Sequence, residues 1–417
     1  MNNSKSISDL SVLVIGTTCA DMINPGFDFL DEIQEDGLVV DSGRFKPVHP
    51  KWLAYDQGKG TNAMGGGSLN VAPLLAKSGR RTGIMTALGK KSNFGKKYYD
   101  RHGKFMLDIM QQTGVVPIIV DNYRYPSGAS FIRPERSGRN PILHCPNAVD
   151  NLDIEKPEIL ERIEQTPEGS FIHYLYSGLM AKMDEENGRK LARVVERLSK
   201  KYHVMVDTHT FVPNVDEVIA QGLGIPRYNY LKPVLPHLSV FFCSAAEARM
   251  ISNTFDMKVD SDFEDEWNMY FLTRLSDHFT KPGQPQIYGI TAGTDAFILY
   301  RKPNGDRVGP IKVESQYVIS EASQFVGAGD SFRAGFELEF TRLDRTYSDS
   351  FKVGELEEHD LSQLCRMGHL MAACYVTRRP DSQYGNIPRY EKMIDLLNRG
   401  ISFIDKTELL RELDVIR

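Results

Sequence analysis

The sequence predicts an α/β fold of three layers, a sandwich in which a mainly parallel central sheet is covered by helices on both faces. Short apolar runs typical of buried strands alternate with helical patterns along most of the chain, which is the order expected for such a sheet. The chain has 417 residues, of which 41% are hydrophobic, so it can bury a sizeable core. We expect residues 1–417 to form a single domain.

The N-terminal part of the chain shows the alternation first. Residues 11–16 are a short apolar run that ends in glycine, as expected for a buried parallel strand. A helical pattern at 70–77, a strand at 82–88 and a helix at 94–112 follow.

The rest of the chain repeats this order. Residues 184–200 form a charged amphipathic helix, a further helix begins near Ala245, and 403–417 read as a short C-terminal helix. The charged segment 342–360 predicts a solvated loop. The strands expected in this part are 171–176, 203–207, 238–243, 286–291 and 295–300.

The carboxyl ends of the predicted strands indicate where a ligand would bind. In parallel α/β sheets, ligands bind just beyond these ends. One rim of the sheet would therefore gather the residues that directly follow predicted strands: Gly16, Asp207, Ser244, Ala292 and Gly327.

Two segments interrupt the alternation. Residues 24–64 contain an alternating run at 37–45 inside a polar, glycine-rich stretch, and residues 115–145 contain strand-like runs at 115–120 and 127–132. Long insertions in compact domains are often functional. A pair of surface hairpins without function would give the same pattern.

Composition excludes several classes of protein. With 50 basic and 55 acidic residues the net charge is −5, so there is no basic excess that would indicate a nucleic-acid partner. The five cysteines are scattered and never form a CxxC pair, which fits reduced thiols in a cytoplasmic protein. No apolar run approaches the roughly 18 residues of a membrane span, so we expect no membrane partner.

Residues 327–336 read GAGDSFRAGF and carry the clearest chemical signal. A glycine-rich turn that leads into a helix leaves backbone N–H groups free at the positive helix end, which suits a phosphate or an oxyanion. Gly327 and Gly329 allow close backbone approach, and Asp330 places a carboxylate beside these amides. This combination suits phosphoryl transfer. An aspartate that merely caps the helix would look the same.

A second motif lies far upstream. Residues 65–72 read GGGSLNVA, followed by PLLAKSG at 73–79 and TALG at 86–89. Together with the segment at 327–336, this pattern resembles the ribokinase (PfkB-type) family of carbohydrate and nucleoside kinases, over roughly residues 10–400. The resemblance implies a ribokinase-like fold in which 24–64 and 115–145 form a small β-sheet lid over the substrate, through which two copies can pair as a homodimer.

The resemblance also implies the residues that bind the sugar or nucleoside. Asp21 lies where the family has an aspartate that binds sugar hydroxyls, and a carboxylate accepts two hydroxyl hydrogen bonds at once. Gly65 and Gly66 match the glycine pair that lets substrate approach the backbone. Asn70 matches the substrate-binding asparagine.

The nucleotide end matches less completely. Thr291 and Gly293 match the segment that lies near the ATP phosphates, although Asp295 stands where the family has a glycine. Glu247 matches the glutamate that organises Mg²⁺ through water, with Ser244 in place of an asparagine. One acidic side chain suffices for an ion that keeps several waters.

One substitution bears on a further cofactor. Gln324 replaces an aspartate of the family's second motif, which removes a charge beside the anion site and bears on any dependence on a monovalent cation.

The resemblance and the residues together predict an ATP- and Mg²⁺-dependent kinase that phosphorylates a hydroxymethyl group of a sugar or nucleoside. Asp330 would remove the hydroxyl proton, while the turn formed by Gly327, Ala328 and Gly329 would stabilise the charge on the transferred phosphate. The departures at Ser244, Asp295 and Gln324 leave an alternative open, a catalytically silent relative that senses a nucleotide or sugar.

Overall fold

The computed structural model describes residues 6–24, 26–27, 30, 38–40, 62–93, 96–133, 142–212, 214–259, 261–319, 326–342, 346–378, 382–403 and 405–414. Within them, a ten-stranded sheet has the order β15-β14-β13-β12-β11-β10-β1-β5-β6, with β7 also paired to β5. The strands β7, β5, β1, β10, β11, β12 and β13 pair in parallel, and β6, β14 and β15 are antiparallel to their neighbours. The predicted mainly parallel sheet is thus confirmed. Its strands are β1 (Val12–Gly16), β5 (Thr82–Asn93), β6 (Lys96–Tyr99), β7 (Val116–Asn122), β10 (Phe171–Ser177), β11 (His203–Thr208), β12 (Val240–Ser244), β13 (Gln286–Ala292), β14 (Asp295–Arg301) and β15 (Arg307–Val313).

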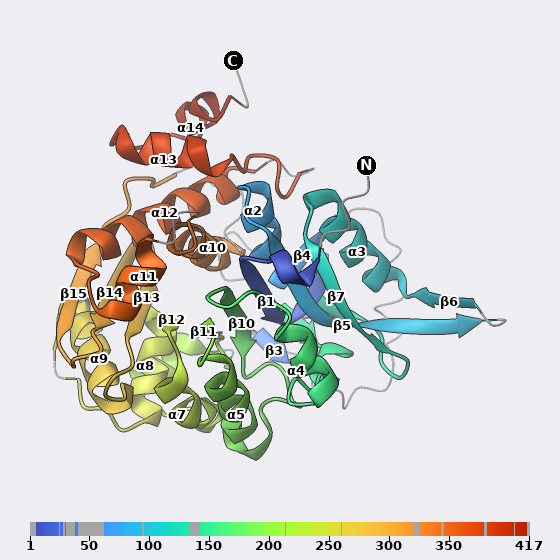
Figure 1. Ribbon diagram of the computed structural model, residues 1–417, viewed down its shortest axis with the longest axis horizontal. Helices are drawn as coiled ribbons and strands as arrows, with labels where there is room; N and C mark the ends of the chain where they lie inside the picture. The colour runs from blue at the N-terminus through green and yellow to red at the C-terminus, as the bar shows by residue number, and fades with distance from the viewer. Residues whose placement is uncertain are drawn as a thin grey trace.

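Helices cover both faces of this sheet because alternate strand residues point to opposite sides. In β1, Val12 and Val14 pack into one hydrophobic core, and Leu13 and Ile15 pack into the other. Figure 1 shows the two helical layers on either side of the strands. The first core includes α2 (Ala72–Lys77), α3 (Arg101–Thr113), α10 (Ala328–Phe340), α11 (Thr346–Val353), α12 (Glu358–Val376), α13 (Tyr390–Asn398) and α14 (Lys406–Glu412). The second includes α4 (Pro157–Ile163), α5 (Arg189–Leu198), α7 (Leu231–Val234), α8 (Ala245–Thr254) and α9 (Glu264–Phe279), with α6 (Val215–Ala220) packed against it.

A second, smaller sheet lies beside the central one, as expected for a lid. It has five strands in the order β3-β9-β8-β2-β4. One face packs a small core that includes Met22, Phe131 and Leu143, so the alternate residues of the same strands point to the opposite face. Its strands are β2 (Thr18–Ile23), β3 (Leu38–Val40), β4 (Asn62–Gly67), β8 (Gly128–Ile132) and β9 (Ile142–Cys145).

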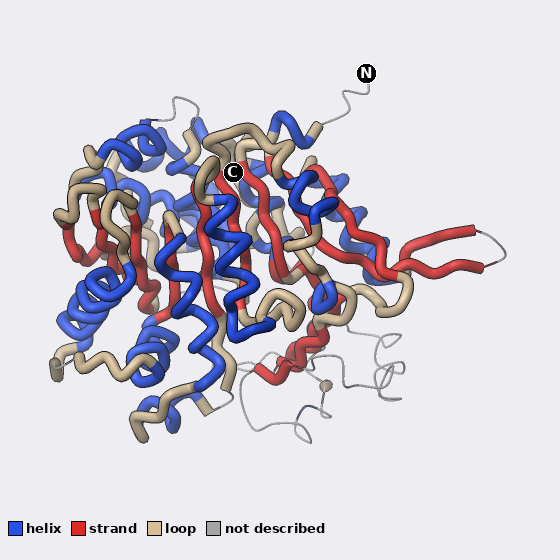
Figure 2. Tube along the Cα trace, turned by 60° about the horizontal axis from the view of Figure 1, so that its bottom comes forward, coloured by secondary structure: helices blue, strands red, loops and turns tan. Residues whose placement is uncertain are grey.

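Three sequence-based expectations are corrected. The run at 115–120 is not part of the small sheet, because β7 continues the central sheet in parallel with β5. The helix expected at 94–112 begins only at Arg101, where Asp100 caps it by accepting from the Gly103 N–H; before it, β5 and β6 form a hairpin that projects from the body (Figure 2). The segment 342–360, expected to be a solvated loop, contains α11 and the start of α12. The helix α11 forms there because its side chains Tyr347 and Phe351 are buried in the core.

Two further observations concern the cysteines and the character of the helices. All five cysteines are buried and free. Within the described ranges, none of the helices has the length and apolar character needed to cross a membrane.

Candidate active site

A cavity of about 310 Å³ lies at the carboxyl-end edge of the central sheet, next to the small sheet. Its walls come from both sheets and from the glycine turn that precedes α10. The polar residues that line it are Thr17, Cys19, Asp21, Asn70, Ser130, His144, Tyr176 and His209, and Gly67 and Gly327 contribute backbone. The strand-end rule predicted this edge of the sheet, and of the residues that it named, Gly327 lines the cavity.

Gly327 forms the turn that starts α10. Its φ of +87° is left-handed, and a Cβ at this position would lie 2.9 Å from the Tyr375 hydroxyl, so only glycine fits. Gly327 is the N-cap and offers no side chain to the first-turn amides. The N–H groups of Ala328, Gly329 and Asp330 lie in this first turn, where an α-helix has no intrahelical partners for them.

Asp330 lies in the same turn and is 3% exposed. Its Oδ2 accepts hydrogen bonds from Asn70 Nδ2 at 2.9 Å and from the Tyr176 hydroxyl, and its Oδ1 lies 3.2 Å from Arg333 Nη1. Asn70 and Tyr176, which both donate to Asp330, line the cavity, whereas Asp330 is not among the residues that line it. Both oxygens of the predicted base are thus held by protein donors.

Asn70 is itself fixed from behind. It ends a 3₁₀ turn that precedes α2, so the helix expected to start at residue 70 starts at Ala72. Its Oδ1 accepts from the Tyr375 hydroxyl at 3.1 Å and from Gln383 Nε2 at 3.2 Å. These contacts aim the amide nitrogen of Asn70 at Asp330.

Asp21 lies in β2, on the face of the small sheet that borders the cavity. Burial raises the pKa of this carboxyl to about 6, although the polar side chains of Cys19 and Ser130 oppose the shift. Cys19 Sγ donates to Asp21 Oδ1 at 3.2 Å. A Cβ on Gly66 would lie 2.2 Å from the same oxygen, so the glycine makes room for the carboxylate.

Gly65 has a different surrounding from its neighbour. Its N–H donates to Gln383 Oε1 at 2.8 Å, and Gln383 Nε2 donates to its carbonyl at 2.8 Å. A Cβ here would lie 2.7 Å from both Leu69 and the Tyr384 hydroxyl. Gly65 and Gly66 support the cavity wall, whereas Gly67 lines it.

The residues expected at the nucleotide end lie on neighbouring strand ends. Thr291 is the penultimate residue of β13 and pairs with Ser244 of β12. Gly293 lies in the tight turn that follows, with φ +60° and open space around its Cβ position. Asp295 is paired with Lys312 at 3.0 Å. Gln324 lies outside the described residues.

Glu247 forms a capping box with Ser244. Its Oε2 accepts from the Ser244 N–H at 2.8 Å, and its own N–H donates to Ser244 Oγ at 3.2 Å. Its Oε1 accepts from Thr210 Oγ1 at 3.2 Å. No group of three or more His, Cys, Asp or Glu side chains suited to a metal occurs in the described part of the chain. The chemistry at Glu247 fits a hydrated Mg²⁺ held through water, since a single carboxylate is enough for that ion.

A buried chain of charges runs behind Asp330. Arg333 Nη1 lies 3.2 Å from both Asp330 Oδ1 and Asp207 Oδ2. Asp207 also faces His173 at 3.4 Å, and His173 Nδ1 lies 2.6 Å from Glu337 Oε1. Burial works against a charged His173, but Glu337 and Asp207 together raise its pKa to about 9. Carboxylates and cations therefore alternate along this series of buried side chains.

Tyr176 was missed by the sequence reasoning. Its φ of +56° is rare for an aromatic residue, and it sits where the pairing of β10 with β11 shifts register. The Tyr176 N–H donates to Asp207 Oδ1 at 2.5 Å, which stabilises the irregular backbone. This bulge aims the phenol at Asp330; only the position of Tyr176 at the end of a predicted strand hinted at a role.

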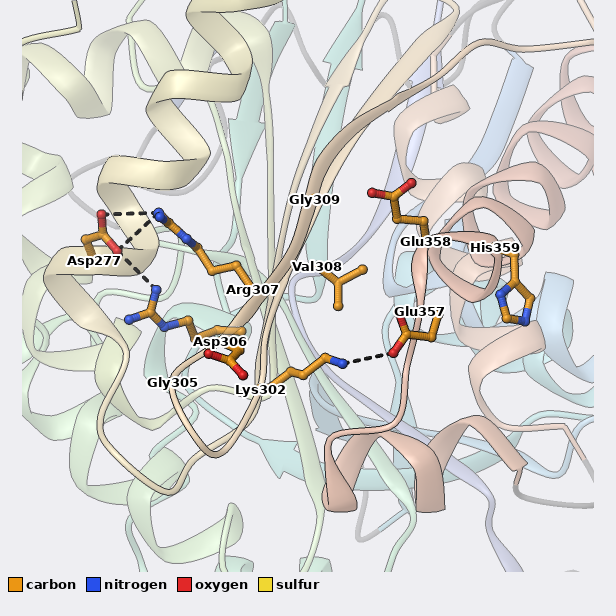
Figure 3. Close-up of a pocket in the computed structure, with 11 residues that line it drawn as sticks. Asp277, Lys302, Gly305, Asp306, Arg307, Val308, Gly309, Glu357, Glu358 and His359 are labelled. Atoms are coloured by element: carbon orange, nitrogen blue, oxygen red, sulfur yellow. Dashed lines mark hydrogen bonds and ion pairs between the residues drawn. The ribbon is translucent and has the colours of Figure 1, made fainter.

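A larger hollow of about 1060 Å³ lies elsewhere (Figure 3). It is placed at the opposite edge of the sheet, because Arg301 pairs in register with Gln286 at the start of β13. Its charges compensate one another: Arg301 lies 3.1 Å from Asp277, and Lys302 lies 2.9 Å from Glu357. This hollow lacks the glycine turn and the buried carboxylates, so the smaller cavity is the candidate active site.

The three-layer fold and the site at the glycine turn define an α/β protein of the ribokinase-like class. The sequence pattern of the family described as pfkB family carbohydrate kinase matches residues 41–384 of this chain. The chain belongs to this family. A sequence comparison with curated proteins finds no match.

Solved structures share the fold at low sequence identity. The ribokinase of Giardia lamblia has a TM-score of 0.62 with 17% identity, and covers 94% of this chain and 99% of its own. The fructokinase of Xylella fastidiosa, solved with bound ATP, has a TM-score of 0.60 with 15% identity over 94% and 99%. The adenosine kinase of Anopheles gambiae has a TM-score of 0.60 with 13% identity over 88% and 95%.

Proposed function

We propose that the protein is an ATP-dependent kinase that transfers the γ-phosphate to a hydroxymethyl group of a neutral sugar or nucleoside. The observation that supports this most strongly is Asp330, a buried carboxylate in the first turn of α10 whose two cavity-side donors, Asn70 and Tyr176, line the same cavity as Asp21. Acceptors for substrate hydroxyls and a proton acceptor beside an anion-binding turn thus lie together.

In this mechanism Asp330 is the general base. The substrate hydroxyl takes the place of the Tyr176 hydroxyl on Oδ2, and its proton passes to Asp330 as the oxygen attacks the γ-phosphate in line. The amides of Ala328, Gly329 and Asp330 stabilise the negative charge that develops on the phosphate. Arg333 keeps the carboxylate oriented through Oδ1.

The remaining residues bind the two substrates. Asp21 accepts hydroxyl hydrogen bonds at the small-sheet wall of the cavity. Thr291 and Gly293 would lie near the phosphates of ATP, and the fructokinase that shares the fold was solved with bound ATP. Glu247 would hold a Mg²⁺ ion through water, and the ion would neutralise charge on the phosphates. A monovalent cation near the turn is a further proposed cofactor.

ADP release in the presence of Mg-ATP and a panel of neutral sugars and nucleosides tests this function. We expect turnover with at least one substrate, and Asp330→Asn to lower it by about 10²–10⁴. Asp277→Asn, which alters a carboxylate at the opposite edge, serves as the control and should leave turnover unchanged. An Asp330→Asn variant with near-parent turnover would show that Asp330 is not the base.

A binding protein without catalysis is the second candidate. It is favoured by the three donors that already occupy both oxygens of Asp330. In that case ligands from the panel raise the melting temperature without any substrate-dependent ADP release.

A further inference from the structure

Three neighbouring strands of the small sheet carry a row of polar side chains that face the cavity. Asp21 in β2 pairs in register with Ser130 in β8, and Ser130 pairs with His144 in β9. All three residues line the cavity. The alternate residues Phe131 and Leu143 pack on the opposite face, so the period-2 pattern of the strands fixes the direction of the row.

Hydrogen bonds run along this row in one direction. The Cys19 thiol donates to Asp21 Oδ1 at 3.2 Å, and the Ser130 hydroxyl donates to Cys19 Sγ at 3.3 Å. Ser130 has only one hydroxyl proton, and this contact uses it. We assign the donor of the 2.9 Å contact between Ser130 Oγ and His144 Nδ1 to Nδ1–H, because in this network the Ser130 proton goes to Cys19 Sγ. In the neutral ring, Nε2 is then a bare acceptor.

Within the described part of the chain, Nε2 of His144 is left without a partner. The residue is 3% exposed, and this nitrogen is buried with no hydrogen-bond partner among the described residues. Burial first, and then the nearby His209, lower the pKa of His144 to about 3, so the ring is neutral at physiological pH. An unsatisfied buried acceptor costs free energy, which a ligand with a matching donor would recover.

The surroundings limit what this ligand can be. The described residues that line the cavity include neither lysine nor arginine, so no cationic side chain among them compensates a phosphate or carboxylate at the small-sheet wall. Ile132, Ile142 and Leu179 provide an apolar surface in the same cavity. An uncharged molecule with an apolar face fits this wall.

We propose that His144 is a specificity-determining residue whose Nε2 accepts a hydrogen bond from a donor on a neutral substrate, either a hydroxyl of a sugar or an N–H of a nucleobase. The proposal rests on the proposed kinase function and deepens it. His144 and Asp21 are two strands apart, and strands are spaced about 4.8 Å from one another. His144 therefore contacts a part of the substrate that Asp21 does not bind.

Two variants separate the acceptor from the structural contact. His144→Asn keeps an N–H donor for Ser130 and removes the acceptor at the Nε2 position. His144→Gln places an amide oxygen near the Nε2 position. The matched control is His203→Asn, because His203 is also buried, has a pKa lowered to about 3 by burial, and contacts a serine hydroxyl, Ser348, at 2.6 Å without lining the cavity.

The experiment measures kcat/KM for the best substrate and for analogues that each lack one donor, namely deoxy sugars and N-methylated bases. In the parent protein we expect one analogue to lose on the order of 10- to 100-fold, as for a lost hydrogen bond to a buried group. In His144→Asn that loss should vanish, with the parent substrate's KM raised and kcat little changed. His144→Gln and His203→Asn should keep the discrimination. If the sensitive analogue is a deoxy sugar, the substrate donor to His144 is a hydroxyl. If it is an N-methylated base, the donor is an N–H.

The outcomes distinguish the two proposals. If His144→Asn discriminates among all analogues as the parent does, the inference is wrong while the kinase function stands. If the parent binds panel members without turnover, the kinase proposal fails, and the same analogue series measured by calorimetric affinity decides the role of His144. Melting temperatures of the variants show whether each one is folded; if His144→Asn unfolds, loss of discrimination in His144→Phe decides instead.

Discussion

Replacing Arg333 with methionine is the sharpest test of the charge chain behind the proposed base. Arg333 is 6% exposed, and its Nη1 lies 3.2 Å from both Asp207 Oδ2 and Asp330 Oδ1. Burial alone would raise the pKa of the Asp207 carboxyl, but Arg333, and after it His173, hold this pKa below its usual range. Without Arg333, two buried carboxylates lose their shared cation.

The expected loss of stability in Arg333→Met depends on the hydrogen-bond and ion-pair partners that each carboxylate keeps. Removing one partner of a buried ion pair typically costs about 3–5 kcal/mol. Asp207 retains His173 and the Tyr176 N–H, and Asp330 retains Asn70 and the Tyr176 hydroxyl. We therefore expect a loss near the lower end, about 3 kcal/mol, in the free energy of unfolding measured in urea. Turnover should fall through kcat more than through KM, because Asp330 is no longer held.

A double variant and a surface control complete this test. In the Arg333→Met protein, Asp207→Asn removes one of the two buried carboxylates that have lost their cation. The loss in free energy of unfolding caused by Asp207→Asn should therefore be smaller in Arg333→Met than in the parent, by a coupling energy of about 1–3 kcal/mol. Arg193 also contacts two carboxylates, Glu155 at 2.6 Å and Glu186 at 2.7 Å, but on the surface. Arg193→Met should change stability little. An equal loss from both arginine variants, or no coupling in the double variant, would refute the reasoning.

Three further outcomes are expected. Gly329→Ala should fold normally, because the nearest atom to its Cβ would be 3.9 Å away, yet raise the KM for ATP several-fold if phosphate approaches the backbone there; a normal KM contradicts this role. Tyr176→Phe should lower the substrate KM by up to about tenfold, since the substrate no longer displaces a hydrogen bond to a carboxylate; a raised KM would show that the phenol binds substrate. The substrate KM should fall as pH rises from 5 to 7, because Asp21 ionises through a pKa of about 6, and Asp21→Asn should abolish this dependence.

The sequence was sufficient to predict the central sheet and the edge at which the candidate site lies. Asp21, Asn70 and Asp330 lie far apart in the chain, and the resemblance to the ribokinase family predicted that they would meet at one site. In the structure Asn70 donates directly to Asp330. Asp21 lies in β2 on the cavity wall.

The residues that the sequence did not reveal depend on pairings between distant segments. Arg333 sits inside the glycine-turn motif, but its role depends on Asp207, which folding brings within 3.2 Å. Tyr176 depends on a bulge that no residue type specifies. His144 lies in a strand of four residues, where Ile142, Leu143, His144 and Cys145 alternate between cavity and core. That alternation was the available signal, and the strand was too short for it to stand out.

The structure also changes what the Asp330 motif means. A local pattern of glycines and an aspartate predicts a base beside an anion site, but the availability of that base depends on Asn70, Tyr176 and Arg333, which come from other segments or from the next helical turn. The same donors that orient the carboxylate also occupy it. In the proposed mechanism a substrate hydroxyl displaces Tyr176 from Oδ2, whereas Arg333 on Oδ1 and Asn70 stay. In that mechanism, the free-energy difference between the Tyr176 contact and the substrate contact decides whether the protein acts as a kinase or only binds its ligand.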